Sequence, residues 1–263
     1  MRYGAMNSPL NSVLSEIELF SEMGFDYLEL TMDAPRAHYT VIREQKNEIL
    51  QSLDRHGMGL ICHLPTFVYT ADLTESIRRV SLQEMLESVD TAAEMGIGKA
   101  VLHAGMISGL GVIAKDMAKA YALESLHQIV RSAEEKNIFL CIENMPPNAG
   151  AFEKPEELEE IMKLCPNHGM TFDAGHAHIK SKNRVSEFMQ RLGNQFSHLH
   201  LSDNRGKKDD HLPIGKGTIN FPEIIRELKR IGYDDTVTFE IFTEDRREIM
   251  RSRETFISML TEI

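Results

Sequence analysis

The sequence has little cysteine, no tryptophan and no long apolar run. Its three cysteines, Cys62, Cys141 and Cys165, form no C-x-x-C pair and are too few for a disulfide framework. No stretch approaches the roughly 18 uninterrupted apolar residues that a membrane-spanning helix needs. The opening residues MRYGAMNSPLNS carry no apolar segment typical of a secretion signal. We therefore expect a cytoplasmic protein with reduced thiols and no membrane partner.

Basic residues are also fewer than acidic residues: the chain has 29 Lys and Arg and 40 Asp and Glu, which gives a net charge of −11. A chain this acidic is not a general binder of polyanions, although a local basic groove is compatible with an acidic total. Aromatic residues make up 7% of the chain, and no stripe of aromatic and basic residues suits stacked single strands. Nucleic acid is therefore the less favoured partner.

No linker or low-complexity segment divides the chain, and one local pattern recurs along it. Glycines that are predicted to end a helix stand shortly before apolar runs at Gly24, Gly57, Gly96 and Gly232. The first helix shows apolar residues at helical spacing at Leu10, Val13, Leu14 and Ile17. The dipeptide Ser8-Pro9 predicts its start, because a hydroxyl cap followed by proline is typical of a first helical turn.

Eight short apolar runs are predicted as strands, each followed by a helix: residues 2–6, 27–31, 59–63, 99–103, 139–143, 169–173, 196–201 and 236–241. Eight such units in about 250 residues are typical of a (β/α)8 barrel. The competing open, doubly wound sheet requires a G-x-G-x-x-G loop after its first strand, and the sequence there is GAMNSP. We predict an α/β protein, a (β/α)8 TIM barrel that forms a single domain over residues 1–263.

Histidines and carboxylates end six successive predicted strands: His63, His103, Glu143, Asp173, His200 and Glu240. Because the carboxyl ends of barrel strands surround one mouth, these six side chains are predicted to converge there. Such a ring without a cation would repel itself, and a divalent metal ion supplies the missing charge. The mixture of nitrogen and oxygen ligands without cysteine favours ions such as Zn, Mn or Co over Ca.

Further polar residues follow the sixth and seventh strands. His176 comes shortly after the sixth strand, and the loop after the seventh contains Asp209 and His211, which extend the predicted ligand set. The same loop carries Arg205 and Lys207 in an otherwise acidic chain. Loops after the last two strands of barrels often hold phosphate, so an anionic substrate is one interpretation of this charge, and solvated side chains are the other.

Other charged and imidazole side chains are predicted to take no direct part. His178 and His198 each lie two residues from a predicted ligand, so we expect them to support a ligand or face the barrel interior. A solvated face of the last helix is expected to carry Arg246, Arg247, Arg251 and Arg253.

The ordered series of strand-end motifs resembles the xylose-isomerase-like barrel superfamily, which joins sugar and sugar-phosphate isomerases and epimerases with endonuclease IV. The motifs are CHLP (62–65), LHAG (102–105), IEN (142–144), FDAGH (172–176), HLSDNRG (200–206), DDHLPIGKG (209–217) and FE (239–240). Each motif is weak alone. Their order is specific and extends through essentially the whole chain.

In the isomerase and epimerase members, one divalent ion is held by two Glu, one Asp and one His. By motif these fall on Glu143, Glu240, Asp173 and His200. The resemblance implies that the two glutamates exchange a proton at the carbon beside a carbonyl. His176 and Arg205 would orient substrate oxygens, and Lys207 is predicted to assist them. The expected substrate is a small sugar or sugar phosphate, and the expected cofactor is Mn, Zn, Co or Mg in one core site.

The resemblance leaves a second activity open. In endonuclease IV nine ligands hold three zinc ions, and each has a counterpart here: His63, His103, Glu143, Asp173, His176, His200, Asp209, His211 and Glu240. The alternative is therefore a multi-zinc phosphodiesterase that acts on abasic DNA, with up to three ions. Short loops after the first two predicted strands favour the sugar enzymes, because a DNA enzyme needs several backbone-contacting cations. Lyase or dehydratase chemistry, and a barrel that merely binds its ligand, are further alternatives. Barrels of this kind often form homo-oligomers, and no interface signature is visible.

Overall fold

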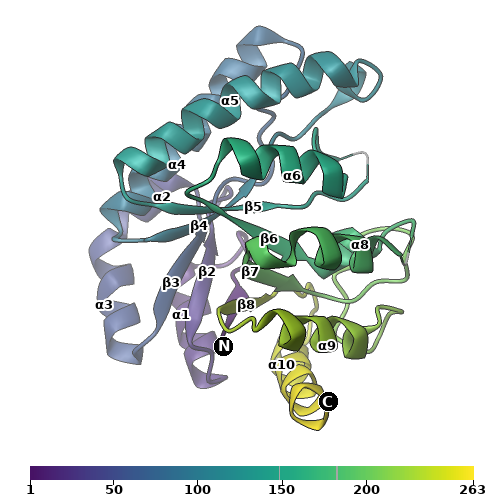
Figure 1. Ribbon diagram of the computed structural model, residues 1–263. Helices are drawn as coiled ribbons and strands as arrows, with labels where there is room; N and C mark the ends of the chain where they lie inside the picture. Colours follow the sequence, from purple (N-terminus) through teal and green to yellow (C-terminus); the bar gives the residue numbers. More distant parts are fainter. Residues whose placement is uncertain (148, 182) are drawn as a thin grey trace.

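The computed structural model describes residues 1–147, 149–181 and 183–263. In this described part, the strands form one closed parallel barrel in the order β1 to β8, with β8 paired to β1 (Figure 1). The strands are β1 (Arg2–Met6), β2 (Tyr27–Thr31), β3 (Gly59–His63), β4 (Lys99–His103), β5 (Phe139–Glu143), β6 (Gly169–Asp173), β7 (Phe196–Leu201) and β8 (Thr236–Phe239). The predicted (β/α)8 barrel is confirmed, and β8 ends two residues earlier than predicted.

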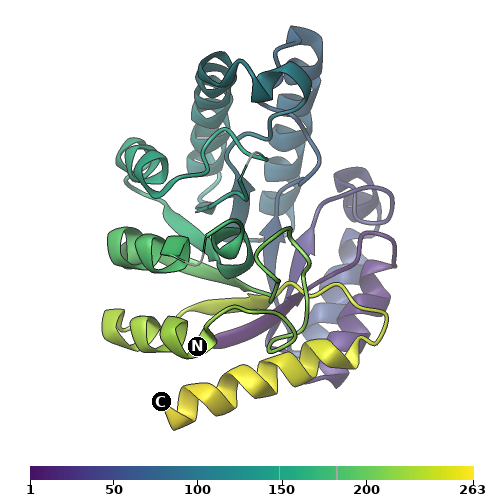
Figure 2. The same ribbon diagram turned by 90° about the vertical axis from the view of Figure 1, so that its right-hand side faces the viewer.

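Helices surround the barrel, and the two views show them outside its strands (Figures 1 and 2). They are α1 (Val13–Glu22), α2 (Tyr39–Glu44), α3 (Lys46–His56), α4 (Glu75–Glu94), α5 (Lys115–Glu135), α6 (Pro155–Leu164), α7 (Ala174–His178), α8 (Asn183–Leu192), α9 (Phe221–Ile231) and α10 (Arg247–Glu262), with 3-10 turns η1 (Gly109–Val112) and η2 (Gly193–Gln195). None of the helices in the described ranges is both long and apolar enough to cross a membrane.

Helix α9 shows how the sequence builds these units. Its apolar residues repeat at helical spacing and are buried against the barrel, and the side chain of Asn220 accepts a hydrogen bond from the Glu223 amide at its start. Gly232 ends the helix with φ of 67°, in the left-handed region that glycine enters without strain. The other three glycines predicted to end helices also have positive φ.

The predicted start of the first helix is wrong. Helix α1 begins at Val13, and Leu10, the first apolar residue of the predicted helix, is 73% exposed. The buried carboxylate of Glu16 accepts hydrogen bonds from the Ser8 amide (3.0 Å) and the Asn11 side chain (2.8 Å). These bonds hold residues 8–11 in a turn before the helix. The segment therefore lies at the border of the barrel mouth.

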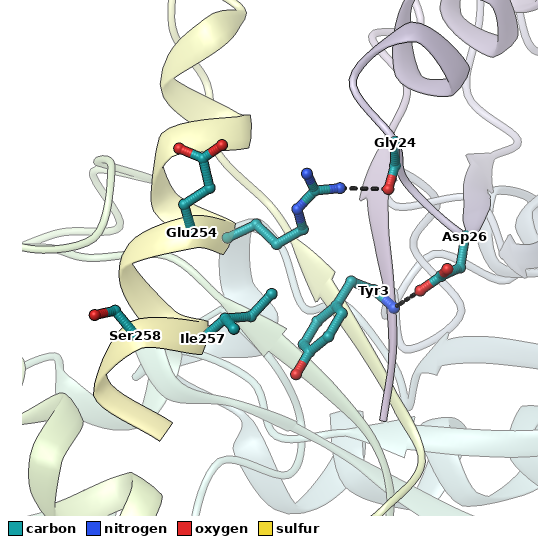
Figure 3. A pocket seen from close by; sticks show the side chains of 7 residues that line it. Tyr3, Gly24, Asp26, Glu254, Ile257 and Ser258 are labelled. Carbon is teal, nitrogen blue, oxygen red and sulfur yellow. Dashed lines mark hydrogen bonds between the residues drawn. The ribbon is translucent and has the colours of Figure 1, made fainter. Parts of the chain in front are cut away.

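Helix α10, at the C-terminal end of the chain, contacts the segment that leads into β2. Arg253 donates a hydrogen bond to the Gly24 carbonyl, and its guanidinium lies 4.5 Å from the centre of the Phe25 ring. Nearby, the Tyr3 amide donates to Asp26 at 2.6 Å (Figure 3). This shallow hollow lies at the amino ends of β1 and β2, opposite the predicted ligands.

The barrel brings the predicted ligands to its other end. His63, His103, Glu143 and Asp173 are the final residues of β3, β4, β5 and β6. The strand register places His103 beside Glu143 and Asp173 beside His200. Glu240 follows β8 directly, and its amide still donates to the Leu201 carbonyl of β7 at 3.2 Å.

Candidate metal centre

The predicted ligands at the mouth of the barrel form three groups that touch one another. We call Glu143, Asp173, His200 and Glu240 the central group, and His63, His103 and Glu143 the second group; in each, one donor atom per residue lies within 4.8 Å of all the others. The loop group consists of His176, Asp209 and His211. The nine side chains that the motifs single out thus lie together, and Glu143 belongs to two groups.

In the central group, Nδ1 of His200 faces oxygens of the three carboxylates. The distances are 3.1 Å to Glu240 Oε2, 3.5 Å to Glu143 Oε1 and 3.8 Å to Asp173 Oδ2. Zinc ligands stand about 2.0–2.2 Å from the ion, so two ligands of one ion are roughly 3–3.5 Å apart. The spacing of the central group is therefore close to that of a metal site.

The second group is arranged around the same glutamate. Glu143 Oε2 lies 3.4 Å from His63 Nε2 and 3.2 Å from His103 Nε2. Glu143 is 1% exposed, and neither of its oxygens has a hydrogen-bond partner. Since buried polar atoms are nearly always satisfied, a carboxylate in this state indicates a missing partner.

The loop group is held by the segment after β7. Asp209 Oδ2 lies 3.0 Å from His176 Nε2 and 2.9 Å from His211 Nε2. The loop folds back through an antiparallel bridge between Asp203 and Leu212, and the buried Asp203 carboxylate accepts hydrogen bonds from four loop amides. This support places Asp209 and His211 over the mouth.

Backbone carbonyls orient several of the imidazoles. Nδ1 of His63 lies 2.7 Å from the Leu64 carbonyl, Nδ1 of His176 lies 2.9 Å from the Asn144 carbonyl, and Nδ1 of His211 lies 3.1 Å from the Glu240 carbonyl. A carbonyl oxygen can only accept, so Nδ1 carries the proton and Nε2 faces the carboxylates. Metal-binding histidines are commonly held in this way.

The carboxylates change the pKa values of these imidazole rings. Burial alone lowers the pKa of His63 and His211, but Glu143 raises the pKa of His63 to about 8 and Glu240 raises the pKa of His211 to about 9. Burial also lowers the pKa of His200. The negative charges of Glu29 and Glu143 raise it by more, so the pKa of His200 lies well above its ordinary value. Burial raises the pKa of Asp173 to about 7. Without a metal ion, the site therefore collects protons to balance its negative charge.

The donor set fits a divalent ion. Buried atoms without a hydrogen-bond partner include both oxygens of Glu143, Oδ2 of Asp173, Nδ1 of His200 and Oδ1 of Asp209. A cation bound among them would give these atoms the partner that the protein does not supply, and it would replace the protons on the imidazoles. The mixture of imidazole and carboxylate suits Zn, Mn or Co.

A cavity of about 470 Å³ borders the metal-type residues. Its lining includes five of the predicted ligands, His103, His176, Asp209, His211 and Glu240. Apolar side chains, Phe67, Met106, Met145 and Phe242 among them, form much of the remaining wall. Glu240 thus faces the cavity directly, whereas Glu143 is buried and absent from the described lining.

Asn7 and Arg246 are among the polar residues that line the cavity but were not predicted there. Asn7 is 1% exposed; its Oδ1 accepts a hydrogen bond from the Thr31 amide (2.8 Å) and its Nδ2 has no hydrogen-bond partner. Arg246 was expected on a solvated face, and this is wrong. It lines the cavity, forms an ion pair with the buried Glu16, and has an Nε atom without a hydrogen-bond partner. The position of Asn7 directly after the first strand was a usable signal.

The basic residues predicted to bind substrate lie elsewhere. Arg205 and Lys207 are exposed, and neither is among the described residues that line the cavity. The neighbouring Lys208 is 80% exposed and pairs with Asp210 at 3.1 Å. A role for Arg205 and Lys207 in substrate binding stays a prediction.

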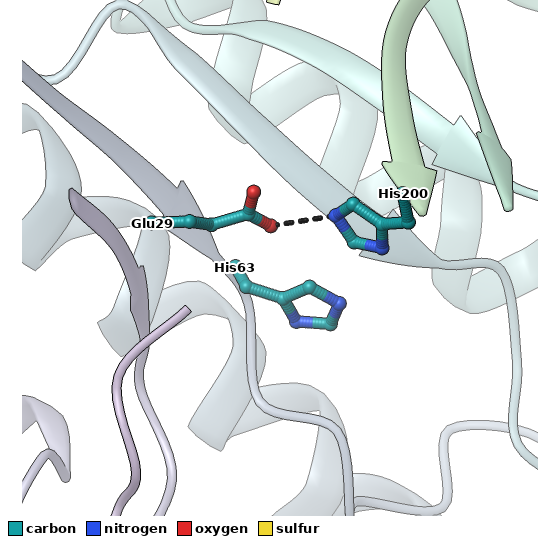
Figure 4. Close-up of side chains that lie close together, drawn as sticks. All are labelled: Glu29, His63 and His200. Atoms are coloured by element: carbon teal, nitrogen blue, oxygen red, sulfur yellow. Dashed lines mark hydrogen bonds and ion pairs between the residues drawn. The ribbon is translucent and has the colours of Figure 1, made fainter. Parts of the chain in front are cut away.

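A glutamate that the motifs did not indicate lies behind the central group. Glu29, in the middle of β2, is fully buried, and its Oε1 accepts a hydrogen bond from His200 Nε2 at 2.8 Å (Figure 4). His198, which we expected to support a ligand or face the interior, is also fully buried and lies 2.9 Å from Glu29 Oε2. A charge within the apolar run YLELT was the signal for Glu29.

Comparisons with known proteins agree with this architecture. A family model described as "Xylose isomerase-like TIM barrel" matches residues 17–258. Fructoselysine 3-epimerase of Shigella flexneri is 25% identical over 257 residues, which cover 92% of this chain and 91% of that protein. The solved structure of a D-tagatose 3-epimerase-like protein aligns with a TM-score of 0.87 and 29% identity, over 100% of this chain and 99% of its own. A Thermus thermophilus protein soaked with ZnCl2 aligns with a TM-score of 0.78 and 25% identity, over 100% and 99% of the two chains.

Proposed function

Because the chain belongs to the xylose isomerase-like TIM barrel family, we propose that it is a metal-dependent sugar isomerase or epimerase. The observation that carries the proposal is the central group, where two glutamates, an aspartate and an imidazole place donor atoms within 4.8 Å of one another. One member, Glu240, lines an adjoining cavity of about 470 Å³. A cavity of this size suits a small molecule. Similarity to sugar epimerases supports the same interpretation.

Glu240 is suited to remove a proton from the substrate. Burial alone raises its pKa, but the charge of His211 reverses this, so the pKa lies below its ordinary value and the carboxylate is ionised at neutral pH. It accepts the proton from the carbon beside the carbonyl, which leaves an enediolate. Return of a proton to the opposite face of that carbon gives the epimer, and return to the neighbouring carbon, with transfer of the hydroxyl proton between the two oxygens, gives the isomer.

Glu143 is the proposed second member of the acid/base pair. It lies next to Glu240 in the central group, where His200 Nδ1 is within 3.5 Å of both carboxylates. A divalent ion bound by Glu143, Asp173, His200 and Glu240 would supply a Lewis acid that polarises the substrate carbonyl. The protein itself supplies the ionised carboxylate, the fixed imidazole and the cavity.

The cavity also offers groups that would hold a polyol. Asn7 and Arg246 line the cavity, and an amide and a guanidinium suit hydroxyl or carbonyl oxygens. The apolar wall covers the less polar face of such a substrate. Since the charge of Arg246 is balanced by Glu16, the cavity itself does not require a phosphorylated sugar.

Solvent deuterium exchange tests the proposal. The metal-loaded protein is incubated in D2O with a panel of free and phosphorylated ketoses, and deuterium in each sugar is measured by mass spectrometry. We expect incorporation at a carbon beside the carbonyl, lost in Glu240→Gln and after chelation. Incorporation that continues in Glu240→Gln would overturn the assignment of the base.

One observation favours a second candidate, a multi-zinc phosphodiesterase. The three groups together place nine potential ligands around the mouth, more than one ion needs. Clustered zinc ions produce hydroxide at neutral pH and stabilise a leaving oxygen. The lining argues against DNA as the substrate. Arg246 is the one Lys or Arg among the described lining residues, and it already pairs with Glu16. Cleavage of a duplex with an abasic site, without deuterium exchange into ketoses, would make this candidate the better one.

A further inference from the structure

A chain of hydrogen bonds runs from the central group through the barrel interior to the other end of the barrel. It passes from His200 to Glu29, His198, Thr236 and Lys99. We propose that Glu29 is a positioning residue that fixes His200 as a ligand through Nδ1, and that its carboxylate sets the direction of the chain through His198, Thr236 and Lys99 behind it. The inference rests on the proposed metal site.

The far end of the chain is Lys99, whose ammonium group can only donate. Lys99 Nζ donates to the Ser197 carbonyl (2.8 Å), to the Asp235 carboxylate (2.9 Å) and to Thr236 Oγ1 (3.2 Å). Thr236 Oγ1 therefore accepts from Lys99, and its single proton is free for its other neighbour. That neighbour is His198 Nδ1, at 2.7 Å.

The next link follows from the neutral form of His198. Since an ionised carboxylate can only accept, the proton of the neutral ring is on Nε2, which donates to Glu29 Oε2 at 2.9 Å, and Nδ1 accepts from Thr236. The ring is fully buried, so bulk water does not compete for its two nitrogens. Both nitrogens are satisfied in this single arrangement.

Glu29 accepts from three directions. His198 and the Thr238 hydroxyl donate to Oε2, and His200 Nε2 donates to Oε1 at 2.8 Å. The Tyr27 hydroxyl in turn lies 2.9 Å from Thr238 Oγ1 and donates to it, because the Thr238 proton is already given to Glu29. An ionised carboxylate is the group that can accept all of these protons.

The consequence at the mouth is a fixed tautomer. With its Nε2 proton held by Glu29, neutral His200 presents its lone pair at Nδ1, toward the carboxylates of Glu143, Asp173 and Glu240. Figure 4 shows this bond, with the ring of His63 beside that of His200. His63, His176 and His211 are oriented by backbone carbonyls, whereas His200 depends on a side chain that mutation can change.

Burial of a carboxylate in a barrel interior is costly unless its bonds are satisfied. A purely structural interior position is filled well by apolar residues, as in most barrels of this type. A carboxylate bonded to a ligand histidine also increases the basicity of the ring, and loss of such a partner commonly lowers metal affinity about 10–100-fold. Glu29 therefore has a role that an isosteric amide would not fulfil.

The first test is Glu29→Gln, which keeps the shape but directs an N–H group at one of the three donors. We expect its affinity for Co²⁺ and Zn²⁺, measured by calorimetric titration of the chelator-treated full chain, to fall about 10–100-fold. The visible spectrum of bound Co²⁺ should change as well. Glu16→Gln is the matched control, because Glu16 is also a buried carboxylate (2% exposed) but lies outside the chain. Its Co²⁺ affinity should stay within about twofold of wild type, whereas wild-type affinity and spectrum in Glu29→Gln would overturn the proposal.

A second measurement needs neither a bound metal nor a variant at Glu29. NMR of the ¹⁵N-histidine-labelled protein should show His198 with its proton on Nε2, and Thr236→Val, which removes the donor to Nδ1 but keeps the Glu29 acceptor, should leave that proton in place. Wild-type His198 protonated on Nδ1 would overturn the direction of the chain, even if Glu29→Gln fails to fold. The proposed function fails separately, when metal-loaded wild type shows no deuterium exchange. A wild-type protein that binds neither ion would overturn both.

Discussion

The Nδ1 atom of His200 lies 3.1 Å from Oε2 of Glu240, a separation that either a shared proton or a shared metal ion can fill. Two other pairs have separations that a proton or a metal ion can likewise fill, namely His63 with Glu143 (3.4 Å) and His211 with Asp209 (2.9 Å). Protons and metal ions therefore compete for one set of atoms.

Metal affinity should rise with pH between about 6.5 and 9. In the absence of a metal ion the pKa of His63 is raised to about 8 and that of His211 to about 9, so both rings carry protons that an ion must displace. Zinc titrations at several pH values, in buffers with different ionisation enthalpies, would show stronger binding and less proton release as pH rises. Affinity that does not change across this range would contradict competition with protons.

The stability of the chelator-treated protein should change with pH in the opposite sense. His63 and His211 have a pKa above the value of 6.5 that they have in an unfolded chain, so their contribution is complete below that value. It is lost as pH rises through about 8 to 9, on the order of a few kcal/mol at about 1.4 kcal/mol per pKa unit. Urea unfolding at pH 6.5 and pH 9 measures this loss. A more stable metal-free protein at pH 9 would count against the charge balance described for the site.

The two glutamates of the central group should differ in their effect on metal content. Glu143 belongs to two groups and Glu240 to one, so Glu143→Gln removes a ligand from both. We expect metal affinity to fall at least about tenfold in Glu143→Gln, and by less in Glu240→Gln. Metal content after dialysis, measured by mass spectrometry beside a circular dichroism control for folding, tests this order. Equal losses would show that Glu143 is not shared.

Arg246→Gln should impair both substrate binding and stability. The change leaves the 2%-exposed Glu16 without its cation, at a cost of about 1–3 kcal/mol, and removes a donor from the cavity. The free energy of unfolding and the KM for deuterium exchange report the two effects. Arg247→Gln, at the exposed neighbouring position, is the control and should change neither. Equal losses of stability and substrate binding in both variants would contradict the role of Arg246 in the cavity.

Much of the fold could be predicted because local signals and tertiary structure agree. Glycines such as Gly57 and Gly232 end helices by a conformation that depends on the glycine itself, and the apolar runs after them are short enough to be strands. In a parallel barrel every strand delivers its last residue to the same end. The positions of His103, Glu143 and Asp173 therefore follow from the order of elements alone.

What could not be predicted depends on partners distant in sequence. Ser8-Pro9 resembles a helix start, but bonds to the distant Glu16 carboxylate hold that segment in a turn before the helix. Arg246 belongs to an arginine-rich segment, and spacing alone does not say which arginine reaches the mouth. Glu29 lies in the middle of a strand rather than at its end, and its partners His198 and His200 are set by the closure of the barrel.

Metal content of the native protein tests the central claim most directly. The chain is purified without chelators or a metal affinity column, and its bound elements are counted by mass spectrometry. We predict about one Mn, Co or Zn ion per chain for the sugar enzyme, and about three zinc ions if the second candidate is correct. Protein that contains no divalent ion, and takes up none when Zn²⁺, Mn²⁺ or Co²⁺ is added, would contradict the metal centre and the reaction built on it.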